Sequence, residues 1–156
     1  MTKKVIVAAS GYFDPIHSGH IRYLKEAKGL GDKLIVILNN DKQSALKKGH
    51  SFMPLEERKV ILKSIRYVDD VFISIDKDRS VSKSLKKIKP SVFAVGMDNY
   101  KNKIPERFVC EKLGIEIADK LAKGMIKHPK QKQSSSKILK NYLKKNKALE
   151  DDRDFE

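Results

Sequence analysis

Five short apolar runs alternate with helix-forming segments along this chain, and the alternation limits its fold more than any other feature. The runs lie at residues 5–9, 34–38, 71–75, 92–95 and 115–117. They are not strictly alternating polar and apolar, so we expect strands that are covered on both faces. Strands separated by helices predict a doubly wound α/β fold with a five-stranded parallel sheet.

The segments between these runs carry helix signals at predictable places. We expect helices over 18–28, from Pro54 onward, ending before Pro90, from Pro105 to Gly114, and over 137–147. In the helix after Pro54 we place Val60, Ile61, Leu62 and Ile65 on the buried face. Residues 39–52 are expected to form a polar loop with at most one helical turn. The length of 156 residues fits one domain over 1–149, followed by a disordered acidic tail over 150–156.

The segment most indicative of a functional site is residues 10–20, which directly follow the first apolar run. A strand followed by a glycine turn and a helix start directs backbone N–H groups and the positive helix end at one point. Two histidines, His17 and His20, add side-chain donors there, and Gly19 between them lets a ligand approach the backbone. We therefore predict an anion site at the carboxyl end of the first strand.

The composition of the chain indicates an anionic partner and a cytoplasmic location. The formal net charge of +14 favours anionic partners, and the segment 120–147 holds ten lysines and no acidic residue. The apolar runs are too short to span a membrane, so we expect no membrane span. A single cysteine, Cys110, excludes an internal disulfide and is typical of a cytoplasmic protein. The chain has neither a GxGxxG nor a GxxxxGK[ST] motif, which disfavours a dinucleotide-binding domain and a P-loop kinase.

The spacing Gly11-x-Phe13-Asp14-x-x-His17-x-Gly19-His20 resembles the signature of the cytidylyltransferase-like nucleotidyltransferases. The resemblance implies a Rossmann-like domain that moves a nucleoside monophosphate from CTP to a phosphorylated acceptor, with glycerol-3-phosphate favoured, and releases pyrophosphate. The alternative within this class is an adenylyltransferase that uses ATP on another phosphorylated acceptor. The resemblance also implies a Mg²⁺ cofactor and a homodimer. The segment 128–132 lacks the arginine that many cytidylyltransferases carry there, which leaves the choice of base open.

The resemblance assigns roles to individual residues. His17 and His20 are expected to donate hydrogen bonds to the α-phosphate, with Lys47 or Lys48 closing over the phosphates and Arg58 facing them. Asp14 is the candidate Mg²⁺ ligand, and the serines at 134–136 are expected to hold the β- and γ-phosphates at the start of the last helix. The full set of nucleotide-binding candidates is Gly11, Tyr12, Phe13, Asp14, Gly19, Asp98, Ser134, Ser135 and Ser136.

Each role has a simpler structural alternative. Arg58 is then an exposed helix residue, the lysines are solvated, the serines only cap a helix, and Asp14 only hydrogen-bonds its turn. Two other functions also stay open. The positive charge allows a nucleic-acid-binding protein, although aromatic residues make up only 7 % and no nucleic-acid motif is present, which disfavours nucleic acid. The last hypothesis is a nucleotide sensor that binds without turnover.

Overall fold

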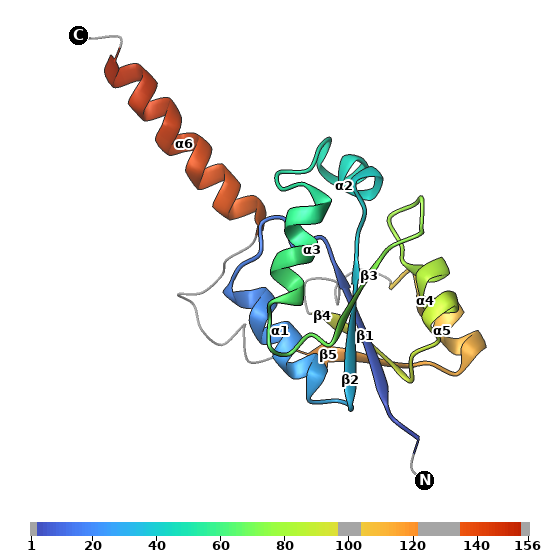
Figure 1. Ribbon diagram of the computed structural model, residues 1–156. Coiled ribbons are helices and arrows are strands. Elements are labelled where there is room, and N and C mark those ends of the chain that lie inside the picture. The colour runs from blue at the N-terminus through green and yellow to red at the C-terminus, as the bar shows by residue number, and fades with distance from the viewer. Residues whose placement is uncertain (1–2, 97–103, 122–134, 154–156) are drawn as a thin grey trace.

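The computed structural model describes residues 3–96, 104–121 and 135–153, and it confirms the α/β fold with one parallel sheet (Figure 1). The strands are β1 (Ile6–Gly11), β2 (Lys33–Leu38), β3 (Asp70–Ile73), β4 (Val92–Gly96) and β5 (Glu116–Leu121). The helices are α1 (Ser18–Lys28), α2 (Asp41–Lys48), α3 (Leu55–Lys63), α4 (Ser82–Ile88), α5 (Arg107–Leu113) and α6 (Ser135–Arg153). The sheet has the order β3-β2-β1-β4-β5, and every pair of neighbouring strands is parallel.

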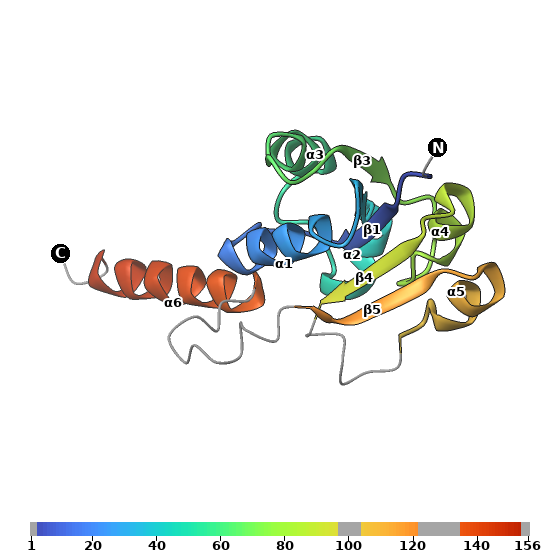
Figure 2. The same cartoon turned by 90° about the horizontal axis from the view of Figure 1, so that it is seen from below.

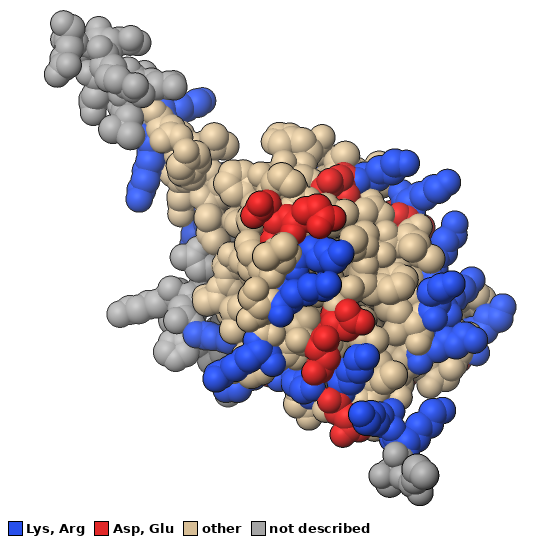
Figure 3. Space-filling view, in the orientation of Figure 1, with Lys and Arg blue, Asp and Glu red and all other residues tan. Residues whose placement is uncertain are grey.

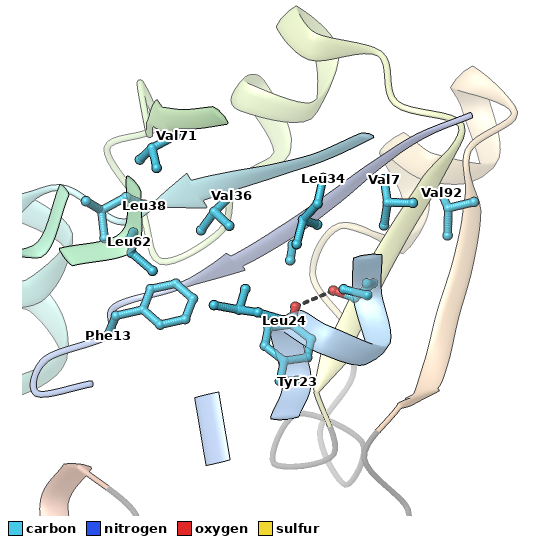
Figure 4. Packing of buried hydrophobic residues seen from close by; sticks show 13 residues of the cluster. Val7, Phe13, Tyr23, Leu24, Leu34, Val36, Leu38, Leu62, Val71 and Val92 are labelled. Carbon is cyan, nitrogen blue, oxygen red and sulfur yellow. Dashed lines mark hydrogen bonds between the residues drawn. The ribbon is translucent and has the colours of Figure 1, made fainter. Parts of the chain in front are cut away.

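Helices cover both faces of the sheet, which explains why the strands have no polar side. Successive strand residues contribute to opposite cores: in β1, Val7 and Ala9 face α1 and α3, whereas Ala8 faces α4 and α5. The first core is drawn in Figure 4, where Tyr23 and Leu24 of α1 and Leu62 of α3 pack over the strands. Figures 1 and 2 show the two layers on either side of the sheet.

The strand order reverses at one point of the sheet. The chain runs outward from β1 to β2 and β3, and then returns to the other side of β1 with β4 and β5. In such sheets the strand order reverses between β1 and β4, and ligands bind at the carboxyl ends of the strands there. The loop after β1, which leads to His17 and to His20 in the first turn of α1, therefore begins at the reversal point.

Three expectations differ from the structure. Residues 41–48 form helix α2 rather than a loop, because Asn40 and Gln43 make a reciprocal capping box at its start. In α3, Val60 is 62 % exposed, since Arg58 and Leu62, one turn apart, occupy the buried face instead. Helix α6 continues to Arg153, four residues into the expected tail.

The described segments contain no membrane-spanning element of the helical kind. None of the helices within 3–96, 104–121 and 135–153 is both long enough and apolar enough to cross a bilayer. This agrees with the short apolar runs of the sequence.

Candidate functional site

The loop between β1 and α1 turns Phe13 into the core. Phe13 has a φ of 51°, a left-handed backbone conformation that is rare for a bulky residue, and it is 2 % exposed. Its ring lies against Gly11, where an added Cβ would stand 2.9 Å from Phe13 Cε2. The ring also meets the His20 imidazole, with centroids 4.9 Å apart. The Phe13 ring thus lies between Gly11 and the His20 imidazole and supports that imidazole.

His17 and His20 cap the start of α1 with their ring nitrogens. His17 Nδ1 accepts a hydrogen bond from the Gly19 N–H, and His20 Nδ1 accepts one from the His17 N–H, both at 3.1 Å. The two imidazoles stack with centroids 3.8 Å apart. Because each Nδ1 is an acceptor, a neutral ring carries its proton on Nε2. The pair therefore presents two Nε2–H donors side by side.

These contacts leave fewer backbone N–H groups at the start of α1 than the sequence predicts. Free N–H groups were predicted at this turn, but those of His17 and Gly19 are bonded to the imidazoles. The helix start therefore offers hydrogen bonds mainly through the histidine rings. Gly19 acts here through its N–H, as the donor that fixes His17.

The environment of His20 keeps its imidazole neutral. Burial, and to a smaller extent the nearby charges of His17, Lys47 and Lys48, together lower the pKa of His20 to about 3. A neutral ring at pH 7 donates through Nε2 without bringing a charge. The low pKa also means that His20 cannot act as a general acid near neutral pH, since it holds no proton to release as imidazolium.

Asp14 is a structural anchor for the loop that precedes α3. It is fully buried, and its two carboxylate oxygens accept hydrogen bonds from the backbone N–H groups of Phe52 (2.9 Å) and Met53 (2.6 Å). Lys48 Nζ donates to the Asp14 carbonyl oxygen at 2.6 Å. Asp14 thus joins the β1–α1 loop to the segment after α2, which is close to the hydrogen-bonding alternative in the sequence analysis.

Arg58 is buried rather than exposed. It is 1 % exposed, and its guanidinium donates to the carbonyl oxygens of Tyr12, Asn39 and Met53 at 2.8–3.0 Å. It also forms an ion pair with Asp41, with Nη2 and Oδ1 2.8 Å apart. Four of its five N–H donors are therefore used within the chain. Arg58 holds three loops together at the carboxyl ends of β1 and β2.

Lys47 and Lys48 stand at the end of α2 and face the β1–α1 loop. Lys47 Nζ lies 4.4 Å from the centroid of the Tyr12 ring, a cation–π contact. Burial lowers the pKa of Lys48, and the neighbouring Asp14 partly opposes this effect. The structure thus brings both lysines to the loop that carries the histidines.

Two buried hydroxyls near this point have no hydrogen-bond partner among residues 3–96, 104–121 and 135–153. They are Tyr12 Oη and Ser44 Oγ, the latter on α2. Burial raises the pKa of Tyr12, and the Arg79 guanidinium lowers it by a smaller amount. Burying a hydroxyl without a hydrogen bond is energetically costly, so these two positions destabilise the fold locally.

The serine segment is described in part. Ser135, the first residue of α6, donates from Oγ to the Pro15 carbonyl oxygen at 2.8 Å, which fixes the start of α6 beside the histidine loop. Asp98 and Ser134 lie outside the described residues, as does the side chain of Ser136. Their expected roles stay predictions.

The described residues do not form a metal site of the expected kind. Within them, no group of three or more His, Cys, Asp or Glu side chains is placed to hold an ion. Both carboxylate oxygens of Asp14 are held by backbone N–H groups, so this residue does not fit the role of a direct Mg²⁺ ligand. We derive no chemical step through a protein-bound metal.

The sequence analysis did not identify the residues that hold the site residues in position. Asp41 pairs with Arg58, Asn40 caps α2, and the backbone of 52–53 binds Asp14. The spacing Asn40-x-x-Gln43 is a capping-box pattern and is a signal for α2 in the sequence. Nothing in the sequence marks the backbone groups of 52–53.

The arrangement suits transfer of a phosphate-containing group. Two imidazole donors, two lysines and a helix start converge at the reversal point of the sheet. The family model described as cytidylyltransferase-like matches residues 8–141 of this chain. The chain belongs to the cytidylyltransferase-like family. It is a nucleotidyltransferase.

Relatives of this family member include several archaeal FAD synthases. The chain is 43 % identical to the FAD synthase of Pyrococcus horikoshii over 112 residues, which cover 71 % of this chain and 70 % of that protein. It is 33 % identical to the FAD synthase of Archaeoglobus profundus over 141 residues, 89 % of this chain and 86 % of that one.

Solved structures of related fold also match this cytidylyltransferase-like chain. A lipopolysaccharide core biosynthesis protein from Thermoplasma volcanium superposes with a TM-score of 0.64 and 28 % identity, covering 74 % of this chain and 94 % of the other. Pantothenate synthetase from Thermus thermophilus, with a TM-score of 0.50 and 14 % identity over 75 % of this chain and 54 % of its own, supports the fold alone.

Proposed function

We propose that this protein is an adenylyltransferase that makes FAD from ATP and FMN. The observation that carries the proposal is the identity of 43 % to an FAD synthase, together with a further FAD synthase matched over 89 % of this chain. These relatives favour the ATP alternative of the sequence analysis over CTP and glycerol-3-phosphate.

The reaction needs no nucleophile from the protein. A phosphate oxygen of FMN attacks the α-phosphorus of ATP, the bond from that phosphorus to the oxygen bridging to the β-phosphate breaks, and pyrophosphate leaves with the bonding electrons. Catalysis then consists of positioning and of stabilising the charge that develops on the α-phosphate oxygens.

The described residues can supply that stabilisation. The Nε2–H groups of His17 and His20 are held side by side by the capping hydrogen bonds, so they are already oriented before substrate binds. Lys47 and Lys48 add positive charge at the same loop. In this proposal the start of α6 at Ser135 receives the outer phosphates of ATP.

A sugar phosphate is the second candidate acceptor. It is suggested by the 28 % identity to the lipopolysaccharide core biosynthesis protein, which is matched over 94 % of its length. The transfer chemistry on the α-phosphate would be the same, so the acceptor is the only difference.

The test is a matrix of donors and acceptors. Purified protein is incubated with ATP or CTP, with Mg²⁺, and with FMN, glycerol-3-phosphate or a heptose phosphate, and pyrophosphate release and product are measured. FAD formation that requires both ATP and FMN supports the proposal. Pyrophosphate release that requires CTP and glycerol-3-phosphate, or ATP and the sugar phosphate, would overturn the FAD assignment. Nucleotide binding without release in any combination would indicate a sensor.

A matched pair of histidine variants distinguishes activity of this protein from activity of a contaminating enzyme. His17→Ala removes a site imidazole, whereas His50→Ala removes an exposed one between α2 and α3. We expect FAD formation to fall only in the first.

A further inference from the structure

The segment between β3 and α4, residues 74–81, is fixed to the start of α2. The side-chain amides of Asn40 and Gln43 donate hydrogen bonds to four of its carbonyl oxygens, those of residues 74, 76, 78 and 80, at 2.8–3.0 Å. Gln43 is fully buried, and both of its amide hydrogens are used in this way. A satisfied buried network of this kind gives a segment one defined position.

This network fixes the position of Arg79 in the segment. Arg79 lies between the two residues whose carbonyl oxygens Gln43 binds. The bend at this point is set by Asp78, whose Oδ1 accepts hydrogen bonds from the N–H and the hydroxyl of Ser80 at 3.0 and 2.8 Å. The backbone of Arg79 is therefore held at the α2 end of the sheet, beside the carboxyl ends of the strands.

Two cations from different elements meet at the Tyr12 side chain. Lys47, one helical turn after the Gln43 that binds the segment, has its Nζ 4.4 Å from the centroid of the Tyr12 ring. Burial raises the pKa of the Tyr12 hydroxyl, and the nearby Arg79 guanidinium lowers it. Arg58 fixes the Tyr12 carbonyl oxygen with a hydrogen bond of 2.9 Å. Tyr12 is thus a fixed point with a lysine on its ring and an arginine near its hydroxyl.

Arg79 has the chemistry and the exposure that a phosphate ligand requires. Its side chain is exposed, and it takes part in none of the ion pairs formed within residues 3–96, 104–121 and 135–153. A guanidinium can donate two parallel hydrogen bonds to one phosphate, and this geometry makes arginine a specific phosphate reader. A lysine beside it adds charge without the same directionality.

The direction of the proposed reaction places the acceptor on this side of the site. In a phosphate displacement the attacking and leaving oxygens lie roughly in line on opposite sides of the phosphorus. The start of α6, which Ser135 ties to Pro15, is where we place the leaving outer phosphates. Figure 1 shows α6 on one side of α2 and the segment leading into α4 on the other. The attacking phosphate is therefore expected on the side of Arg79.

We propose that Arg79, together with Lys47, binds the phosphate of the acceptor and selects acceptors that carry one. Two phosphates that approach each other repel, so cations at the entering phosphate favour the encounter as well as the binding. The inference rests on the proposed transfer of a nucleotide to a phosphorylated acceptor, and it holds for FMN and for a sugar phosphate alike.

The first test removes one positive charge at either of two exposed residues of the same segment. Arg79→Gln is compared with Lys77→Gln in steady-state kinetics, with the donor and the phosphorylated acceptor that give product in the matrix above. We expect Arg79→Gln to raise KM for the acceptor at least about tenfold, because a charged hydrogen bond is lost. KM for the nucleotide, and both constants of Lys77→Gln, should stay within about twofold of wild type. Thermal unfolding of both variants should match wild type, since both side chains are exposed.

Three results of this comparison would overturn the proposal. An unchanged KM for the acceptor in Arg79→Gln would remove the contact. A raised KM for the nucleotide alone would assign Arg79 to the donor. An equal rise of KM for the acceptor in Arg79→Gln and Lys77→Gln would mean that the general charge of the segment acts, rather than the guanidinium near Tyr12.

The second test measures selection for the phosphate directly. Binding of FMN and of riboflavin, which lacks the phosphate, is followed by flavin fluorescence in the presence of a non-hydrolysable ATP analogue. We expect wild type and Lys77→Gln to bind FMN at least about tenfold more tightly than riboflavin, and Arg79→Gln to lose most of this preference.

The outcomes separate this inference from the proposed function. A wild type that makes FAD, with the same FMN preference in Arg79→Gln, keeps the proposed function and overturns the inference. A wild type that uses a different phosphorylated acceptor overturns the FAD assignment, and the acceptor KM of Arg79→Gln in the first test then decides the inference. A wild type that transfers to no phosphorylated acceptor overturns both.

Discussion

The two site histidines each have two functions, one at each ring nitrogen. Nδ1 accepts the capping hydrogen bond at the start of α1, and Nε2 is the nitrogen to which we assign the contact with the α-phosphate. A side chain that caps a helix contributes about 1 kcal/mol to stability. Removing either ring therefore affects folding as well as chemistry, and an alanine variant alone does not separate the two effects.

A change of His17 to Asn separates these functions. Asparagine is a good N-cap residue but lacks the Nε2–H donor. We expect His17→Asn to keep the thermal stability of wild type within about 0.5 kcal/mol and to lower turnover by about 10²-fold or more. His17→Ala should lose both. Calorimetry and steady-state kinetics measure the two quantities, and near-normal turnover of His17→Asn would refute the donor role.

The low pKa of His20 predicts how stability depends on pH. The folded pKa of about 3 lies below the unfolded value of about 6.5. Between these values the unfolded chain binds a proton at this position and the folded chain does not, so stability falls as pH decreases from 6.5 toward 3. In His20→Asn this contribution disappears, and the loss of unfolding free energy between pH 7 and 4.5 should be smaller than in wild type. Urea unfolding at the two pH values measures this difference, and equal losses would contradict the buried neutral state.

At the scale of elements, the site is a junction of three loops held by one arginine. Arg58 joins the loops after β1, β2 and α2 through carbonyl oxygens that become unsatisfied without it. We expect Arg58→Met to lower the free energy of unfolding by ~3 kcal/mol. Arg66→Met, which changes an exposed arginine just beyond α3, should change it by less than ~0.5 kcal/mol. Urea denaturation of both checks this. Full stability with lost activity would instead indicate the phosphate contact expected from the sequence.

The connection between β1 and α1 depends on a glycine that can be tested against a close match. Gly11 and Gly96 both end neighbouring strands of the sheet. An added methyl at Gly11 meets the Phe13 ring at 2.9 Å, whereas at Gly96 its nearest neighbour is Tyr23 at 3.9 Å. Gly11→Ala should therefore displace Phe13 and the His20 ring packed on it, and lower kcat by tenfold or more, an order-of-magnitude estimate for misplaced catalytic groups. Gly96→Ala should stay near wild type, and equal kcat in both variants would show that the Phe13 ring does not position His20.

The elements also show what the sequence could predict. The strands and α1 follow from apolar runs and a glycine-rich stop, both of which are local signals. Arg58 was not recognised as buried, because its partners are backbone carbonyls from three distant segments. For the same reason the role of Asp14 depends on backbone N–H groups of 52–53 that no side-chain pattern reveals. Hydrogen bonds to backbone groups are the part of this site that the composition and residue spacing of the sequence do not predict.

At the scale of the whole molecule, the net positive charge raises the rate at which anions encounter the protein. The net charge is +14, and Figure 3 shows basic side chains gathered over α4 and acidic ones over α3. A field of this sign accelerates the encounter with an anionic substrate, and salt screens it within about 10 Å at 0.1 M. The oriented donors at the site act at contact distance and are screened much less.

This separation predicts different salt effects on two kinetic constants. Raising KCl from about 20 to 300 mM should lower kcat/KM for ATP several-fold, because encounter slows, and leave kcat within about twofold. Lys86→Gln with Lys87→Gln, on the exposed side of α4, removes two charges far from the histidine loop and should reduce the salt dependence slightly. Initial rates at saturating and limiting ATP measure both constants. A kcat that falls in parallel with kcat/KM would mean that screened surface charges take part in the transfer step itself, and that the two imidazoles do not account for it alone.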